Sequence, residues 1–272
     1  MTNNAVVTPL PSYTDGKLPP PNIKLPIYGG DFTRCDQALI EQLRGVSSAT
    51  ASAMMHRMGI RQTFIEGPKS VMPGTKIVGS ILTLQFMPQR EDVASGIAQE
   101  YSEKFSALWA VLEKVMPGDV LAIQAFGDPY TGCLGEMLIT YFKARGGVGI
   151  VADGYIRDSP RVQKIGTPLW VRGFTPNYAS QSSLFPWAYN VPIACSRVLV
   201  LPGDIMIADD DGAVVVPRQI VSEIVRLTLD HEDWEAFSRM RMQEGGTLNK
   251  YYPLNEEGRQ EYEAWRQQQT AE

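Results

Sequence analysis

The spacing of apolar and polar residues divides the chain into helical and extended segments. Residues 36–58 repeat apolar side chains at helical spacing and predict two short helices, whereas residues 76–87 alternate and are rich in β-branched residues, as in a strand. Residues 94–116 predict a long amphipathic helix, and residues 218–243 predict another. We expect an α/β fold, followed beyond residue 243 by a polar tail rich in Glu and Gln.

The middle of the chain carries the clearest pattern, two apolar runs with a helical segment between them. Residues 119–126 and 148–153 are predicted to be buried strands, and residues 136–147 a helix closed by glycines. Such a βαβ unit has parallel strands and a right-handed crossover. The loops after the two strands therefore open at the same carboxyl edge of the sheet, where ligands of open α/β sheets bind.

The second half of the chain alternates short apolar runs with turn residues. Residues 167–173, 197–204, 205–209 and 212–217 are predicted to be strands. The acidic run at 209–211 lacks the ligand spacing and the closing glutamate of an EF-hand loop, so we interpret it as a turn between two strands.

Charged residues and glycines meet at the predicted carboxyl edge. Arg157 and Asp158 come just after the second buried strand, on a turn where neighbouring side chains can serve one site. The arginine can clamp a carboxylate with two hydrogen bonds, and the aspartate can hold a hard cation such as Mg²⁺. Before the predicted helix, a glycine-rich loop leaves the N–H groups of Glu136, Met137 and Leu138 free to bind an anion.

The composition of the chain argues against several classes of function. The net charge of −5 and the pI of about 5.2 indicate no extended basic surface. We therefore expect neither a nucleic-acid nor a membrane partner. Two histidines argue against a histidine-rich metal site and against most Ser-His-Asp schemes. Three widely spaced cysteines form no disulfide framework, and no signal peptide or apolar run of about 20 residues is present, so we expect a cytoplasmic protein.

Three segments are expected along the chain. Residues 1–30, rich in proline and glycine, predict an extended N-terminal arm. Residues 31–217 form the α/β domain that carries the candidate site. Residues 218–272 form a C-terminal helix and tail that pack on their own or on a neighbouring subunit.

Three sequence elements together resemble one known family. They are "GEML" (135–138), "GGVGIVADGYIRD" (146–158) and "PGDIMIADDDGAVVVP" (202–217). In this order and spacing they resemble the class II 4-hydroxy-4-methyl-2-oxoglutarate aldolases, a family that includes the regulator of ribonuclease E activity A. The resemblance runs from about residue 36 to residue 217. It implies an RraA-like, swivelling β/β/α-type domain with a βαβ core and flanking helices, assembled as a homotrimer or a hexamer with sites between subunits.

The resemblance also implies roles for individual residues. Asp158 would hold Mg²⁺ or Mn²⁺, and Arg157 would bind the carboxylate of pyruvate or its enolate. Backbone amides from Gly135 through Glu136 and Met137 to Leu138 would complete the carboxylate cradle. Glu136 would order the water around the metal ion.

A neighbouring subunit would contribute one more acid from its C-terminal helix. Glu235 matches that acid best, with Glu232 next. This chain departs from many relatives at Ala53, where they carry an aspartate in the second helix. It is also longer at both ends, so its substrate could differ from that of the family's namesake.

The implied activity is that of a divalent-metal-dependent carbon–carbon lyase acting on a 2-keto acid. It would cleave a 4-hydroxy-2-oxo acid such as 4-hydroxy-4-methyl-2-oxoglutarate, decarboxylate oxaloacetate, or do both, through a pyruvate enolate. Two alternatives stay open: a protein-binding regulator of RNA processing without chemistry, and a decarboxylase of another sugar- or aromatic-derived keto acid. Aromatic residues that could line the far end of the substrate pocket, or lie in the core, are Phe126, Tyr130, Tyr155, Trp170 and Phe174.

Overall fold

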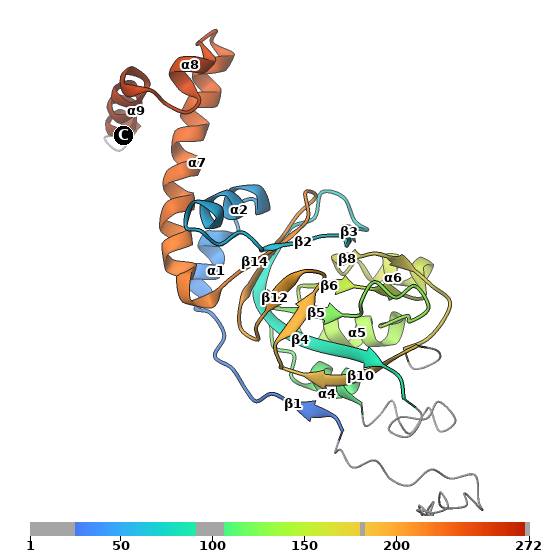
Figure 1. Ribbon diagram of the computed structural model, residues 1–272. Helices are drawn as coiled ribbons and strands as arrows, with labels where there is room; N and C mark the ends of the chain where they lie inside the picture. The colour runs from blue at the N-terminus through green and yellow to red at the C-terminus, as the bar shows by residue number, and fades with distance from the viewer. Residues whose placement is uncertain (1–24, 91–105, 180–182, 270–272) are drawn as a thin grey trace, which may run out of the picture.

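A single mixed sheet organises the main domain (Figure 1). The computed structural model describes residues 25–90, 106–179 and 183–269. Strands β4, β5, β6 and β8 pair in parallel at the centre, and antiparallel strands extend the sheet on both sides. The strands of this sheet are β1 (Ile27–Tyr28), β2 (Phe64–Ile65), β3 (Lys69–Ser70), β4 (Ile77–Pro88), β5 (Asp119–Gln124), β6 (Gly149–Asp153), β8 (Leu169–Val171), β10 (Leu184–Tyr189), β13 (Ile205–Ala208) and β14 (Ala213–Val216).

Two small pairs of strands lie outside the large sheet, and helices cover it. The pairs are β7 (Tyr155–Ile156) with β9 (Gly173–Phe174), and β11 (Ile193–Cys195) with β12 (Val198–Val200). No helix of the described residues is long and apolar enough to cross a membrane. The α-helices are α1 (Gln37–Leu43), α2 (Ser48–Arg57), α4 (Ala107–Glu113), α5 (Glu136–Ala144), α6 (Ser159–Ile165), α7 (Val221–Gln243), α8 (Leu248–Tyr251) and α9 (Glu256–Gln269).

Three clusters of buried apolar side chains fix these layers. One joins α4 and α5 to β4, β5 and β6, and it includes the fully buried Phe86 and Phe142. A second lies between the other side of the sheet and the β11–β12 pair, around Trp170. A third packs α1, α2 and α7 against β13 and β14, around Met55. Each large apolar side chain that is fully buried contributes about 1.5–3 kcal/mol relative to exposure.

The βαβ unit predicted in the middle of the chain is confirmed. Strands β5 and β6 are parallel and in register, with Ala122 opposite Val151, and α5 connects them. A buried ion pair anchors the start of β5: Arg34 donates from Nε and Nη2 to the two carboxylate oxygens of Asp119, each at 2.7 Å. The loops that carry the candidate site therefore follow the parallel strands β5 and β6 at the centre of the sheet.

Most of the other predicted elements are also confirmed. The predicted strand at 76–87 is β4, and the four short apolar runs contain β8, β12, β13 and β14. The turn between β13 and β14 closes an antiparallel pair in which Asp209 and Gly212 exchange backbone hydrogen bonds. Residues 94–105 of the helix expected at 94–116 lie outside the described residues, and α4 lies in the remainder.

Only the last residues of the expected N-terminal arm belong to the described part of the chain. Residues 1–24 lie outside it, and β1 pairs in parallel with β10. The division of the chain into an arm, a catalytic domain and a C-terminal segment stays a prediction.

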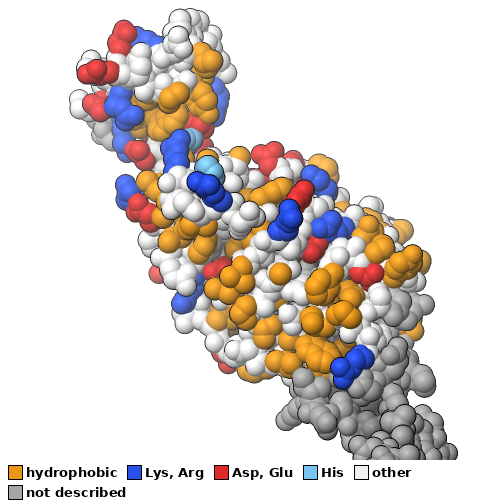
Figure 2. Space-filling view, viewed as in Figure 1, with side chains coloured by type: hydrophobic (Ala, Val, Ile, Leu, Met, Phe, Trp, Pro, Cys, Tyr) orange, Lys and Arg blue, Asp and Glu red, His pale blue; other side chains and the backbone are white. Residues whose placement is uncertain are grey.

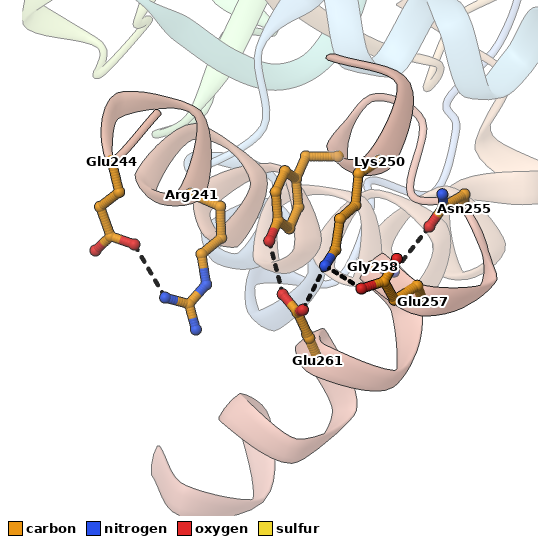
Figure 3. A network of polar contacts seen from close by, with 8 residues as sticks. Arg241, Glu244, Lys250, Asn255, Glu257, Gly258 and Glu261 are labelled. Atoms are coloured by element: carbon orange, nitrogen blue, oxygen red, sulfur yellow. Dashed lines mark hydrogen bonds and ion pairs between the residues drawn. The ribbon is translucent and has the colours of Figure 1, made fainter. Parts of the chain in front are cut away.

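The polar tail expected after residue 243 is folded into helices. Helices α8 and α9 follow α7, and together they form a lobe that projects from the main domain (Figure 2). Phe237, Tyr251 and Tyr262 form a small core of their own. At the surface of this lobe Lys250 donates to Glu257 and Glu261, and Arg241 pairs with Glu244 (Figure 3). These few aromatic anchors, rather than an apolar stripe, hold the polar helix α9 in place.

Candidate active site

Two loops at the carboxyl edge of the sheet are joined backbone to backbone. The N–H of Cys133 donates to the carbonyl of Tyr155, and the N–H of Arg157 donates to the carbonyl of Leu134. The loop after β5 and the segment after β6 are therefore held side by side. Arg157 follows β7 directly, so this pairing sets where its side chain starts.

Asp158 has an unusual backbone conformation. It precedes α6 with φ 63° and ψ 33°, the left-handed region that aspartate and asparagine enter more readily than most side chains. One oxygen, Oδ2, accepts the N–H of Glu136 at 3.1 Å and lies 3.4 Å from Nε of Arg157. The carboxylate of Asp158 therefore touches both the neighbouring arginine and the start of α5.

The first turn of α5 is only partly available to an anion. The prediction that three N–H groups are free is wrong for Glu136, whose N–H donates to Asp158. For the N–H groups of Met137 and Leu138, the described residues supply no acceptor. A carboxyl or enolate oxygen in the pocket has these two donors within its reach, together with the positive end of the helix dipole.

Two glycines are needed for this close approach. A Cβ on Gly135 would lie 2.5 Å from Oδ2 of Asp158 and 2.8 Å from Nε of Arg157. A Cβ on Gly132 would lie 2.2 Å from the carbonyl oxygen of Asn177. Any larger residue at either position would push the two loops, or the side chains between them, apart.

The two loops and α4 enclose a pocket of about 370 Å³. Arg157 and Asp158 are the charged side chains among its lining residues, and the remainder of the wall is apolar or uncharged. The lining residues are Leu108, Trp109, Gly132, Cys133, Leu134, Gly135, Met137, Leu138, Arg157, Asp158, Tyr178 and Ala179.

The charged groups of this pocket remain available to a ligand. The guanidinium of Arg157 lies over the ring of Tyr178 at 6.0 Å, and neither of its Nη atoms donates to a described residue. A second cavity of about 590 Å³ contains Arg172 and Arg197 together with Glu66 and Asp153, and Arg172 already donates to Asp153, to the carbonyl of Glu66 and to Oγ of Ser196. The pocket at Arg157 combines a cation with the N-terminal turn of α5, so we take it as the candidate for an anionic ligand.

Glu136 does not face the pocket. Its carboxylate accepts Nη1 of Arg161 at 3.0 Å in an ion pair at the surface, and it is not among the lining residues. Among the lining residues that the structure describes, Asp158 is thus the one acid. No group of three or more His, Cys, Asp or Glu side chains in the described part of the chain could hold a metal ion. Mg²⁺ needs only one or two protein carboxylates when waters and substrate oxygens complete its shell, so this donor set fits a substrate-bridged ion but not a closed cage.

The two acids predicted on the C-terminal helix lie elsewhere in the subunit. Helix α7 packs with α1 and α2 at the β13–β14 end, away from α5 and α6 (Figure 1). Glu235 lies 3.7 Å from Nδ1 of His231, and Glu232 accepts Oγ1 of Thr50 at 2.9 Å. Ala53 is exposed on α2, the helix that holds Thr50. Neither acid reaches the pocket of its own subunit.

The aromatic residues proposed for the far wall are not among the residues that line this pocket. Trp170 is fully buried in the core and donates its indole N–H to the carbonyl of Asp209, and Phe126 lines the second cavity. Trp109 of α4 and Tyr178 take their place. Trp109 lies in the predicted helix at 94–116, but no feature of the sequence indicates that this helix borders the site.

Cys133 lines the pocket without offering a nucleophile. Its side chain is fully buried, and burial raises the pKa of the thiol far above its ordinary value. The chemistry of the site therefore depends on Arg157, Asp158 and backbone N–H groups.

Comparison with known proteins places the chain among relatives with two kinds of name. The profile of the RraA-like family, Aldolase/RraA, matches residues 35–215. A 4-hydroxy-4-methyl-2-oxoglutarate aldolase of Thermus thermophilus is 30% identical over 108 residues, which is 40% of this chain and 65% of that protein. A Halalkalibacterium halodurans protein that carries the same name provisionally is 32% identical over 150 residues, 55% of this chain and 64% of its own length. The matched part thus spans less than two thirds of either relative.

A solved structure resembles the chain over a longer stretch. RraAS2 of Streptomyces coelicolor, described as an unusual member of the RNase ES inhibitor RraA protein family, is 56% identical and superposes with a TM-score of 0.72. The similarity covers 78% of this chain and 100% of that one. On the family profile and this shared fold, the chain belongs to the RraA-like Aldolase/RraA family.

Proposed function

We propose that the protein is a divalent-metal-dependent lyase that releases pyruvate from a 2-keto acid. The reaction is retro-aldol cleavage of a 4-hydroxy-2-oxo acid, decarboxylation of oxaloacetate, or both. The observation that carries this proposal is the convergence of Arg157, Asp158 and the first turn of α5 on one pocket. Relatives that bear an aldolase name support the same class of reaction.

Arg157 and the start of α5 would bind the substrate's carboxylate. The Nη atoms of Arg157 can make two parallel hydrogen bonds to it, a geometry that lysine cannot reproduce. The N–H groups of Met137 and Leu138 would stabilise the oxygen on which negative charge develops. Removing one such preorganised donor typically lowers kcat by about 10²–10³-fold.

Asp158 would hold the metal ion through Oδ1, since Oδ2 is used by the N–H of Glu136. A bound Mg²⁺ or Mn²⁺ supplies Lewis acidity that lowers the energy of the pyruvate enolate. Glu136, tied to Arg161 at the rim, would support the water around the ion from outside the pocket rather than hold the ion itself.

The remaining step is removal of the proton from the C4 hydroxyl. The family resemblance assigns this step to an acid of a neighbouring subunit, and we propose Glu235 or Glu232 of a second copy of the chain for it. Within one subunit neither acid reaches the pocket. The assembly would then be a homotrimer or a hexamer, which light scattering of the purified protein tests directly. A monomer with full activity would contradict this assignment.

The lyase proposal is tested by a coupled assay for pyruvate with 4-hydroxy-4-methyl-2-oxoglutarate and oxaloacetate. We expect release only with Mg²⁺ or Mn²⁺, loss of turnover in Asp158→Ala, and a large loss of kcat/KM in Arg157→Lys. Equal rates with and without EDTA, or an active Asp158→Ala variant, would refute it.

A second function has its own support in the 56% identity to RraAS2, which is described within an RNase ES inhibitor family. In that case the chain would bind an endoribonuclease of the RNase E type and slow RNA cleavage. Inhibition of such a nuclease by Asp158→Ala as strong as by the unmodified chain, together with no pyruvate release, would favour the regulator. Release of CO₂ from another sugar- or aromatic-derived keto acid, with no pyruvate from either test substrate, would favour a related decarboxylase.

A further inference from the structure

The candidate pocket is polar at one end only. Arg157 and Asp158 lie beside the start of α5, whereas the lining residues that α4 contributes, Leu108 and Trp109, are apolar. Arg157 is the one cation among the lining residues that the structure describes. Arg157 can pair with a carboxylate at one end of a ligand. For a second carboxylate on the same ligand, the described lining residues offer no partner of opposite charge.

The apolar wall continues beyond the pocket along α4 and α5. A third cavity, of about 290 Å³, shares Trp109, Met137 and Leu138 with the candidate pocket and runs on to Tyr141. We call this third cavity the extension, and the extension together with the apolar wall of the pocket the tail groove. Met137 and Tyr141 stand one helical turn apart on α5, so the extension is about 6 Å long. The remaining residues that line the extension are Leu112, Glu113 and Thr140.

Several large apolar side chains of the tail groove are open to solvent. Trp109 is 39% exposed, Met137 74% and Tyr141 38%. The acid at the far end, Glu113, accepts the hydroxyl of Tyr141 at 2.8 Å, and its charge would repel an incoming carboxylate. An exposed apolar surface that continues directly from a carboxylate cradle is suited to the apolar tail of the same ligand.

We propose that the tail groove selects substrates: monocarboxylic 2-keto acids with an extended apolar or aromatic substituent, in preference to dicarboxylic ones. This inference rests on the proposed function, because the same carboxylate cradle orients the tail. The substrate class is thus 4-hydroxy-2-oxo acids with an alkyl or aryl group on C4.

The reaction on such a substrate is balanced without any further reactant. The C4 hydroxyl loses its proton to the acid–base group, and C4 becomes the carbonyl of an aldehyde. The C3–C4 bond breaks, its electron pair stays on C3 as the pyruvate enolate, and a proton returns to C3. The apolar tail leaves as an aldehyde along the tail groove, and pyruvate remains at Arg157.

Binding is tested first, by calorimetry with the full chain and MgCl₂. The ligands are pyruvate, 2-oxobutanoate, 2-oxopentanoate, 2-oxohexanoate and 2-oxooctanoate, with 2-oxoglutarate as the dicarboxylic match of 2-oxopentanoate. Each methylene buried in the groove is expected to tighten binding about fourfold, from about 0.8 kcal/mol per buried CH₂. Affinity that does not change with chain length, or tighter binding of 2-oxoglutarate than of 2-oxopentanoate, would overturn the inference.

A charge placed in the extension tests where the tail lies. Thr140 is exposed on α5 and lines the extension, so Thr140→Glu should abolish the gain from pyruvate to 2-oxooctanoate. Gln163→Glu adds the same charge at an exposed position on α6 outside the groove, and it should keep the gain. Circular dichroism checks that both variants fold. A gain that survives in Thr140→Glu would refute the placement.

Turnover separates this inference from the proposed function. We expect kcat/KM for pyruvate release to be at least about tenfold higher with 4-hydroxy-2-oxo-4-phenylbutanoate than with 4-hydroxy-4-methyl-2-oxoglutarate, the equivalent of two buried methylenes. Preference for the dicarboxylate overturns the tail assignment and leaves the lyase standing. A steep dependence of binding on chain length, with no pyruvate released from any hydroxy acid, supports the tail assignment and overturns the lyase.

Discussion

Gly135→Ala changes the candidate site by one methyl group and leaves every charged residue in place. The new Cβ would lie 2.5 Å from Oδ2 of Asp158 and 2.8 Å from Nε of Arg157. An ordinary contact begins near 3.4 Å, so the two side chains must retreat by roughly 0.9 and 0.6 Å. The hydrogen bond from the N–H of Glu136 to Asp158 is then lengthened or lost.

The loss of activity should exceed the loss of stability. A displacement of about 1 Å in a substrate-positioning group can lower the rate by about 10²-fold, or about 2.7 kcal/mol. The backbone of Gly135, at φ −127° and ψ −178°, is open to alanine without strain. Loss of one hydrogen bond lowers the free energy of unfolding by about 0.5–1.5 kcal/mol. Alanine also restricts the unfolded chain more than glycine does, which raises the free energy of unfolding by about 0.4–1 kcal/mol. The free energy of unfolding should therefore change by less than about 1 kcal/mol.

The assay is kcat/KM for pyruvate release, measured beside urea unfolding of the same preparation. Gly45→Ala is the matched control, because its nearest neighbour, the carbonyl oxygen of Gln42, lies 3.9 Å from the added Cβ. This control should retain full activity. An active Gly135→Ala variant, or an equal loss in Gly45→Ala, would show that the contact with Asp158 and Arg157 does not set the rate.

Three further predictions concern the body of the protein. Arg34→Ala should lower the free energy of unfolding in urea by about 2–4 kcal/mol, because Asp119 is 1% exposed and, within the described residues, its carboxylate keeps the N–H of Met116 as its one remaining donor. Arg34 is partly exposed, which places the loss below that of a fully buried pair. Phe237→Ala should weaken the C-terminal lobe by about 3–5 kcal/mol, seen as faster hydrogen exchange in α8 and α9 with β4–β6 unchanged. Burial raises the pKa of the Cys133 and Cys195 thiols, so the thiolate that reacts is scarce at neutral pH, and a disulfide reagent should label them only after unfolding.

The parts of the site that follow from local pattern were predictable. Periodicity alone placed β5, α5 and β6, and parallel pairing brings the ends of β5 and β6 to one edge. That geometry is the reason Arg157 and Asp158 could be expected near Gly135, although Gly135 and Asp158 are 23 positions apart in the sequence. Gly135, Arg157 and Asp158 all line one pocket, which supports the expectation that they lie close together. Their chemical roles stay a prediction.

Competition between side chains was not predictable from the sequence. The sequence shows that α5 has free N–H groups at its start, but not that Asp158 would take one of them. It shows Glu136 at the helix start, but not that Arg161, on the next helix, would draw its carboxylate to the rim. Such choices depend on distances of a few ångström between separate elements, which no spacing along the chain encodes.

Long-range packing explains why the outer elements were not predicted one by one. Helix α9 is strongly polar, and its Tyr262 packs near Phe237, which lies on α7. Strand β1 is only two residues long and pairs with β10, far away in the sequence. Two residues are too few to show a periodic pattern, and a helix as polar as α9 offers few apolar side chains to mark one, so contacts with distant residues supply most of the stability of such segments.

The left-handed backbone of Asp158 explains how two adjacent residues can serve one pocket. On an extended strand the side chains of neighbouring residues point to opposite faces, so Arg157 and Asp158 would be separated. The φ of 63° at Asp158 turns the chain between β7 and α6, and both side chains then line the same pocket, 3.4 Å apart. Asparagine enters this conformation as readily as aspartate, whereas alanine does not. Asp158→Asn therefore keeps the turn and removes the charge, so a comparison of its metal affinity with that of Asp158→Ala separates the role of the carboxylate from that of the backbone.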